Sequence, residues 1–283
     1  MDIEFKNIEK SFLQRKNGQQ QTLRVLAETS FSINSGEFFS IIGPSGCGKS
    51  TLLNLLAGLE TPDRGQVVLG GSKVVTEPGP DRAVVFQEHG LMPWMTVRAN
   101  VEYGLKLAGI PKSERSDRAM KYLKMVHLGR FADSLPHQLS GGMKQRVAIA
   151  RGLALEPQAL LMDEPFSALD AQTRDVLHEE LQRIWQETKT TILFVTHNLS
   201  EAVYLSDRIL IMTTAPGRIK SIVRVPYPHP RAKDSEELSS FSAQLHSLIR
   251  EEVNRVQALE LDPDWKPEDQ PRPDSVVNVG EGI

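Results

Sequence analysis

Short, predominantly apolar runs are separated by helix-like segments in the middle of the chain. Residues 38–42 (FFSII), 159–162 (ALLM) and 191–196 (TILFVT) have the composition of strands buried on both faces of a sheet. Residues 173–187, between the last two runs, have helical spacing. Two such strands joined by a helix form a βαβ unit, so the pattern predicts an α/β fold with a parallel sheet.

The first 35 residues predict a different kind of β-structure. Their pattern is typical of antiparallel strands, with a polar insertion, 14–22, at a hairpin. Further strands are expected at 66–75, 83–86 and 209–213. Residues 97–155 change character and are mostly helical, with interruptions at 109–111 and at Pro136. This stretch is expected to be an inserted helical subdomain.

The composition shifts after Val225, where three prolines interrupt regular structure. Residues 234–259 carry apolar side chains at mostly i, i+3, i+4 spacing, which predicts one amphipathic helix. We expect its apolar stripe to dock on the rest of the chain, and contact with a partner subunit is the alternative. The last residues are rich in Pro, Asp and Glu and are expected to be loose.

Composition excludes several classes of protein. A net charge of −3 gives no support for general nucleic-acid binding. A single cysteine among 283 residues rules out an internal disulfide framework and a zinc–cysteine cluster, and it favours a reducing compartment. The charged N-terminus lacks the apolar region of a signal peptide, and no apolar run approaches the roughly 18 residues of a membrane span.

A glycine-rich loop follows the apolar run 38–42. Its pattern is G-x-x-x-x-G-K-S, and an apolar helix is expected after it, at 51–57. Glycines let backbone amides turn toward phosphates, and the start of the helix favours anions. Lys49 is expected to reach the β- and γ-phosphates, Ser50 to bind Mg²⁺, and Thr51 to contact the α-phosphate. The nucleotide-binding residues predicted here are Gly43, Pro44, Ser45, Gly46, Cys47, Gly48, Lys49, Ser50 and Thr51.

Two acidic residues follow the apolar run 159–162. We expect Asp163 to help hold Mg²⁺ and Glu164 to polarise the attacking water. A solvated acidic pair at the end of a strand is the simpler alternative.

The stretch 139–146, LSGGMKQR, distinguishes this chain from other nucleotide-binding proteins. Ser140 is a good helix N-cap, but two glycines directly after a cap weaken a helix start. Gly141 and Gly142 are explained if a phosphate must approach the backbone closely. Together with the phosphate loop, this stretch resembles the ATP-binding subunits of ATP-binding-cassette (ABC) transporters, and the resemblance extends over about residues 1–224.

The resemblance implies a P-loop NTPase (RecA-like) core with an antiparallel β subdomain and an α-helical subdomain at about 90–155. It implies an ATPase domain at 1–225, followed by a tail at 226–283. It also implies further site residues. Gln87 matches the Q-loop glutamine that contacts Mg²⁺ and water, His197 matches the switch histidine, and Asp170 ends a loop that crosses the dimer interface. Phe12 matches the aromatic residue that stacks on adenine, and a place in the β core is the equal alternative.

Members of this family bind ATP and Mg²⁺ between two subunits. The stretch that corresponds to 139–142, called here the signature loop, contacts the γ-phosphate held by the other subunit. The resemblance therefore implies a homodimer or a heterodimer, bound to transmembrane permease subunits at the cytoplasmic face of the membrane. Residues 79–82 (GPDR), 84–94 (VVFQEHGLMPW), 100–104 (NVEYG) and 213–218 (TTAPGR) are similar to importers of nitrate, sulfonate, taurine or bicarbonate, in which a binding protein selects the solute.

Three other classes of protein contain a phosphate loop of this kind. A soluble ABC-type ATPase with a regulatory role remains the main alternative, although intact Glu164 and His197 argue against a protein that binds ATP without hydrolysis. Relatives in translation or DNA repair carry a second cassette, long coiled coils or zinc sites, which this chain lacks. A P-loop kinase would not contain the 139–146 stretch.

Overall fold

The computed structural model describes residues 1–16, 19–214 and 216–261. Within them, a six-stranded sheet has the strand order β10-β9-β3-β8-β7-β6. Neighbouring strands from β9 to β6 are parallel, and β10 runs antiparallel to β9. The strands are β3 (Phe38–Ile42), β6 (Arg82–Val85), β7 (Ala159–Asp163), β8 (Thr191–Val195), β9 (Arg208–Met212) and β10 (Ile219–Arg224). The arrangement confirms the predicted α/β fold, and β10 is an addition to it.

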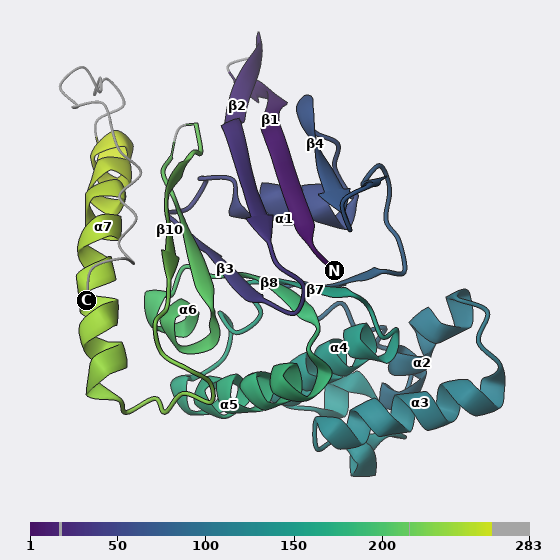
Figure 1. Ribbon diagram of the computed structural model, residues 1–283. Helices are drawn as coiled ribbons and strands as arrows, with labels where there is room; N and C mark the ends of the chain where they lie inside the picture. The colour runs from purple at the N-terminus through teal and green to yellow at the C-terminus, as the bar shows by residue number, and fades with distance from the viewer. Residues whose placement is uncertain (17–18, 215, 262–283) are drawn as a thin grey trace.

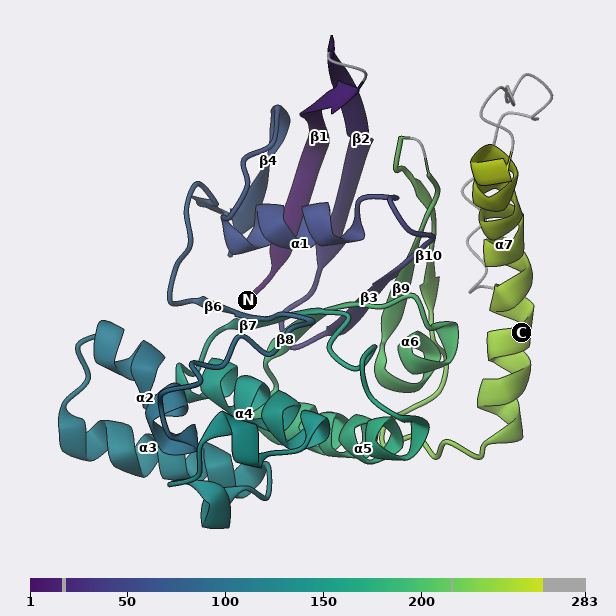
Figure 2. The same cartoon turned by 180° about the vertical axis from the view of Figure 1, so that it is seen from behind.

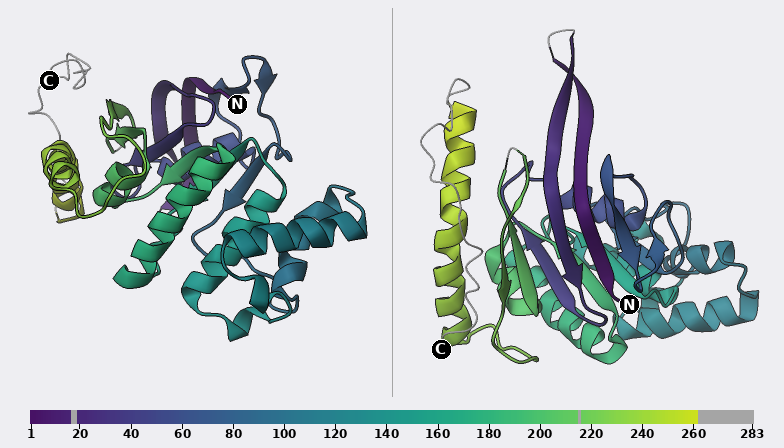
Figure 3. Two further views of the ribbon diagram at one scale, coloured as in Figure 1. Left: turned by 60° about the horizontal axis from the view of Figure 1, so that its bottom comes forward. Right: turned by 45° about the horizontal axis from the view of Figure 1, so that its top comes forward.

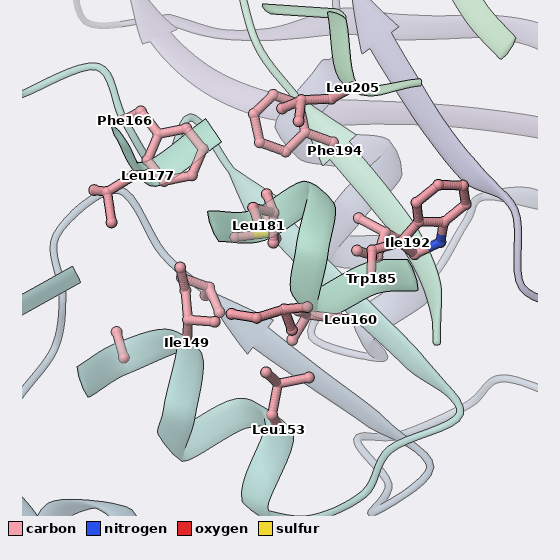
Figure 4. Packing of buried hydrophobic residues seen from close by; sticks show 14 of the residues in the cluster. Ile149, Leu153, Leu160, Phe166, Leu177, Leu181, Trp185, Ile192, Phe194 and Leu205 are labelled. Atoms are coloured by element: carbon pink, nitrogen blue, oxygen red, sulfur yellow. The ribbon is translucent and has the colours of Figure 1, made fainter. Parts of the chain in front are cut away.

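Both faces of this sheet are covered, as the apolar runs predicted. Along β3 the side chains alternate, so that Phe38 and Ile42 belong to one core cluster and Phe39 and Ile41 to another. The first cluster packs α4 (Gly141–Ala154), α5 (Ala171–Thr188) and α6 (Leu199–Leu205) against the sheet. Figure 4 shows Leu160 and Ile192 of the sheet among side chains of α4 and α5.

A second sheet, in the order β2-β1-β4-β5, covers the other face together with α1 (Lys49–Ala57) (Figure 1). Its strands are β1 (Ile3–Lys16), β2 (Gln19–Ile33), β4 (Arg64–Leu69) and β5 (Lys73–Val74), all antiparallel. The predicted hairpin is present, but the polar stretch 14–22 is mostly strand, paired from Leu13–Thr22 to Lys16–Gln19. The strand expected at 66–75 is divided, because Gly70 and Gly71 form a turn with positive φ.

The helical stretch predicted at 97–155 is confirmed. It contains α2 (Val97–Leu107), α3 (Lys112–Met125) and α4, with two short 3₁₀ turns, η1 (Gly129–Phe131) and η2 (Pro136–Gln138), before α4. The three α-helices pack on one another at one side of the molecule (Figure 2). The interruptions at 109–111 and at Pro136 fall where expected, between α2 and α3 and in η2.

The helix expected at 234–259 is observed as α7 (Glu236–Leu261), which stands beside β10 and α6 (Figures 1 and 3). Leu238 and Leu245 are buried in the core cluster, and Phe241 makes an edge-to-face contact with Tyr227 at 5.9 Å. The first half of the stripe therefore docks on the chain itself. The side chains of Ile249, Val253, Val256 and Leu259, and the loose end expected beyond residue 261, lie outside the described residues. No helix in the described ranges is long and apolar enough to cross a membrane.

Candidate functional site

The carboxyl ends of neighbouring parallel strands bring the predicted site together. The phosphate loop follows β3, and Glu164 directly follows β7. His197 is the second residue after β8, and Gln87 is the second residue after β6. Since β3, β8, β7 and β6 are adjacent in this order, these segments all lie at one edge of the sheet. Ligands bind at this edge in open α/β sheets.

The phosphate loop has the backbone geometry of an anion cradle. Gly46 and Gly48 have φ angles of 75° and 93°, which residues with a Cβ rarely adopt. In the described part of the chain, the amides of Gly46, Gly48, Lys49 and Ser50 donate no hydrogen bond to other backbone groups. The Lys49 ammonium donates to the carbonyl oxygens of Gly43 (2.9 Å) and Pro44 (3.0 Å), so its charge lies at the loop. Unpaired amides beside a held ammonium favour phosphate.

The back of the loop is held by two other segments. A Cβ on Gly217 would lie 2.0 Å from the Cys47 carbonyl oxygen, and Gly217 exchanges backbone hydrogen bonds with Val25 (2.8 Å) and Ala27 (3.0 Å). The Cys47 side chain is completely buried in the core. The Cys47 sulfur lies 4.0 Å from the Lys49 ammonium, so the buried side chain packs behind the loop at the lysine that serves it. The sequence predicted the loop but not Gly217, which lies in the 213–218 stretch.

Ser50 and Asp163 meet across the site. The Ser50 hydroxyl donates to Oδ1 of Asp163 at 3.1 Å. Burial raises the pKa of the Asp163 carboxyl and the charge of Glu164 adds to this, while the Ser50 hydrogen bond and the charge of Lys49 act against it. The donors are hard oxygens, which suit Mg²⁺. The described residues contain no cluster of three His, Cys, Asp or Glu side chains that could hold a metal.

Glu164 and His197 form a pair at the next two strands. Nδ1 of His197 lies 2.9 Å from Oε2 of Glu164, within hydrogen-bond distance. The Glu164 amide donates to the carbonyl of Val195 at 2.9 Å, and its φ angle is 44°. A left-handed backbone is unusual for a residue other than glycine and is often found at functional sites. The structure thus brings the two predicted residues together, 33 positions apart in the chain.

Gln87 is exposed and, among the described residues, its side chain makes no hydrogen bond to Ser50 or Asp163. The next part of its loop is fastened to α4. Arg151 donates to the carbonyls of His89 (2.9 Å) and Gly90 (2.6 Å), and the Gln145 side chain lies 2.5 Å from the His89 ring. Sequence reasoning missed Arg151 and Gln145. The available signal was two polar side chains on the mainly buried helix α4, which begins within the 139–146 stretch.

The signature loop and the segment ending at Asp170 lie side by side. Ser140 caps α4 by accepting from the Met143 amide (3.3 Å), and Asp170 caps α5 by accepting from the Thr173 amide (2.9 Å). Hydrogen bonds from Thr173 lower the pKa of Asp170. Gly142 is buried against α5, since a Cβ there would lie 2.4 Å from Thr173 Cγ2. Ser140 and Gly141 are exposed.

Phe12 lies on β1 opposite Leu23. It is partly exposed and lies outside both core clusters, and the Lys10 ammonium stands 4.9 Å from its ring centre. Val25 and Leu26 of the paired strand reach the phosphate loop, because a Cβ on Gly48 would lie 3.3 Å and 2.5 Å from their side chains. Phe12 therefore lies on β1, the strand next to the one that adjoins the phosphate loop.

Several known proteins are similar to this chain in sequence. Residues 26–167 match the family described as ABC transporter. An uncharacterized ABC transporter ATP-binding protein of Methanocaldococcus jannaschii is 52% identical over 231 residues, covering 82% of this chain and 86% of that protein. The nitrate import ATP-binding protein NrtD of Synechocystis sp. is 44% identical over 259 residues (88% and 96%). The aliphatic sulfonates import ATP-binding protein SsuB of Bacillus cereus is 45% identical over 218 residues (77% and 85%).

Solved structures agree with the sequence matches. The dimeric ABC transporter cassette MJ0796 superposes with a TM-score of 0.69 at 34% identity, covering 80% of this chain and all of that one. The same cassette in a post-hydrolysis state bound to ADP and Pi gives a TM-score of 0.68 at 33% identity, with the same coverage. The sequence and structural matches together show that this chain belongs to the ABC transporter family, as an ATP-binding subunit that hydrolyses ATP with Mg²⁺.

Proposed function

We propose that this subunit drives a membrane importer for a small anion such as nitrate, a sulfonate, taurine or bicarbonate. The proposal is supported by three relatives whose names state import or transport of nitrate, aliphatic sulfonates and bicarbonate, at 44–50% identity. The matched part of the bicarbonate protein CmpC of Synechococcus elongatus is 35% of its length. The transport role is inferred for the complete complex, in which this chain supplies the ATPase.

The observation that carries the ATPase mechanism is the single edge at which Lys49, Ser50–Asp163 and Glu164–His197 lie. Free amides of the phosphate loop bind the phosphate oxygens of ATP, and the Lys49 ammonium exchanges its carbonyl contacts for the β- and γ-phosphates. Ser50, Asp163 and Gln87 are the residues that hold Mg²⁺, which supplies positive charge at the phosphates when bound.

Water attack is assigned to the Glu164–His197 pair. The Glu164 carboxylate orients and polarises a water molecule in line with the γ-phosphate, and His197 holds Glu164 through the 2.9 Å contact and faces the same phosphate. Phosphoryl transfer needs positioning and charge stabilisation more than covalent chemistry, which fits a site of cations, amides and one carboxylate base.

The second half of each site comes from another subunit. Ser140 and Gly141 are exposed, and in the described residues no hydrogen bond joins residues 140–142 to residues 43–51. The start of α4 therefore offers its amides to an anion outside its own chain. Dimeric cassettes are known for this fold. We infer a head-to-tail dimer, a homodimer in the simplest case, with Asp170 at the interface and Phe12 stacked on adenine.

A permease contact is assigned to the surface around the Q-loop and α2. Phe86, Trp94 and Leu107 are large apolar side chains exposed there, with Trp94 74% accessible. Such side chains suit a short apolar segment of a membrane partner at the cytoplasmic face of the membrane. Arg151 ties the loop after Gln87 to α4, the helix that begins at the signature loop. A movement of this loop at the permease is therefore passed to the residues that contact the γ-phosphate.

The proposal is tested by co-expression with candidate permease and binding-protein subunits, followed by reconstitution into liposomes. We expect MgATP-dependent uptake of one of the named anions, and loss of hydrolysis in EDTA. Trp94→Asp should reduce uptake and permease binding and leave the basal ATPase rate unchanged. Leu13→Asp, which alters an equally exposed side chain on the hairpin, is the matched control. ATPase activity without binding to any permease would favour the alternative, a soluble ABC-type ATPase with a regulatory role.

A further inference from the structure

A buried carboxylate lies behind the switch histidine. Glu201 on α6 is 7% exposed, and both of its carboxylate oxygens accept hydrogen bonds. Oε2 accepts from the Thr196 hydroxyl at 2.6 Å, and Oε1 accepts from Nε2 of His178 at 3.1 Å. Burial acts to raise the pKa of Glu201. The hydrogen bonds from His178 and Thr196 and the charge of Arg174 outweigh burial, so the pKa lies below its ordinary value and the carboxyl is ionised.

The carboxylate holds the residue before His197, and that residue in turn holds the one after it. The Thr196 hydroxyl that donates to Glu201 also accepts from the Asn198 amide at 3.0 Å. The Glu201 amide in turn donates to the Asn198 side chain at 3.3 Å. Thr196 is therefore tied to the carboxylate directly, and Asn198 is tied to it through the Thr196 hydroxyl. The His197 side chain is itself largely exposed, and its interaction among the described residues is the contact with Glu164.

The same carboxylate reaches the loop that ends at Asp170. His178 and Arg174 are both on α5, the helix that Asp170 caps. The Arg174 guanidinium donates to the Leu169 carbonyl at 2.8 Å, and its Nε lies 3.9 Å from Oε1 of Glu201. Leu169 precedes Asp170, and the Glu164 carbonyl accepts from the Ser167 hydroxyl at 2.9 Å in the same loop.

These contacts close a ring. It runs from Glu164 along the loop to Leu169, through Arg174 to Glu201, and back through Thr196 and His197 to Glu164. We propose that Glu201 is a positioning residue that sets the place of His197 against Glu164 and couples it to the loop at the subunit interface. This inference rests on the roles proposed above for Glu164 and His197.

A stabilising role alone does not explain the arrangement. Burying a carboxylate costs free energy that an apolar residue of similar size would not, and α6 is otherwise packed by apolar side chains. Glu37 gives a comparison within the chain. It is equally buried and is paired with Arg208 at 3.2 Å, but it precedes β3, at the end of the sheet opposite the phosphate loop.

The first experiment compares Glu201→Ala with Glu37→Ala. Both variants lose a buried ion pair and should lower the melting temperature. Only Glu201→Ala should lower kcat for ATP hydrolysis, by roughly tenfold to a hundredfold, with KM and ATP affinity within about threefold of wild type. Glu201→Gln should restore most of the rate, because its amide oxygen still accepts from Thr196. Equal kcat in Glu201→Ala and Glu37→Ala would overturn the proposal.

A second pair of variants serves if Glu201→Ala does not fold. Thr196→Val keeps the volume and removes the hydroxyl, and Thr196→Ser keeps the hydroxyl. We expect a loss of about tenfold in kcat for the first and less than about threefold for the second. Equal rates in both would contradict the link through Thr196.

The decisive measurement repeats Glu201→Ala in a His197→Ala background, by single-turnover hydrolysis. If Glu201 acts through His197, it should lower the residual rate by less than about twofold there. A full, additive loss would show that Glu201 acts elsewhere and would overturn the inference. Wild-type activity of His197→Ala alone would instead contradict the proposed role of His197, so the two failures are distinguishable.

Discussion

The two halves of the nucleotide site differ in how many partners they have within the chain. At the sheet edge, Lys49, Ser50 and Glu164 each contact another site residue or the phosphate loop at 2.9–3.1 Å. At the start of α4, Ser140 and Gly141 are exposed, and Ser140 contributes a helix cap. One half is thus assembled by folding, while the other is presented to the outside. This difference fits the proposed dimer, in which one chain binds ATP and a second subunit completes the site for hydrolysis.

Glu164→Gln is the strongest test of the assembled half. The amide keeps the size of the side chain but cannot polarise water, so kcat should fall roughly a hundredfold or more. Nucleotide affinity should stay near the wild-type value, and ATP should trap a stable dimer by size-exclusion chromatography. Glu187→Gln, which changes an exposed carboxylate of α5, serves as a control. Wild-type turnover of Glu164→Gln would remove the residue from its assigned role.

Ser140→Arg disrupts the exposed half of the nucleotide site, and Lys49→Ala disrupts the half at the sheet edge. Ser140→Arg should block dimer closure and leave ATP binding intact, whereas Lys49→Ala should weaken binding itself. Each protein alone should be inactive. Mixed in equal amounts, they should recover roughly a quarter of the wild-type rate, because half of the dimers contain one complete site. Continued inactivity of a purified heterodimer would show that the halves are not shared.

Leu245→Ala tests whether α7 stabilises the fold without taking part in either half of the nucleotide site. The side chain is 3% exposed, and removing it should cost roughly 2–4 kcal/mol of unfolding free energy. The ATPase rate of the folded protein should not change. Gln244→Ala, one position along and exposed, should cost less than about 0.5 kcal/mol. Chemical denaturation measures both values, and equal stabilities would mean that α7 does not dock as observed.

Phe12→Ala should have the smallest effect, since it removes a stacking contact worth about 1 kcal/mol and should raise KM for ATP about fivefold. Phe12→Tyr keeps the ring and should stay near wild type. Leu13→Ala changes the next residue, on the opposite face of β1, and is the matched control. An unchanged KM in Phe12→Ala would place adenine elsewhere.

The parts predicted from sequence are those encoded by neighbouring residues. β3, β7 and β8 are apolar runs that need no distant partner to be detected, and the phosphate loop and Asp163–Glu164 follow them directly. Parallel strands place their carboxyl ends at one edge, and the folded chain groups these residues there. The tail helix was predicted because its apolar spacing extends over several turns.

The parts that were missed depend on contacts between distant segments. β10 has a mixed sequence, IKSIVR, and becomes a strand by pairing with β9. α6 has seven residues, too few for a periodic signal. Glu201 is separated by 23 positions from His178, and Arg151 by 62 from His89. No local pattern links such pairs, so their roles were visible only in the folded chain.

The left-handed backbone of Glu164 has a consequence for engineering and evolution. A non-glycine residue at a φ of 44° costs roughly 1–2 kcal/mol relative to a relaxed conformation. Glycine would remove that cost. A screen that rewards folding stability alone should therefore enrich Glu164→Gly, which unfolds at a higher temperature and lacks ATPase activity. Under the role proposed for Glu164, selection for turnover and selection for thermal robustness act in opposite directions at this position. A directed-evolution campaign on this cassette should therefore hold position 164 constant while improving the rest.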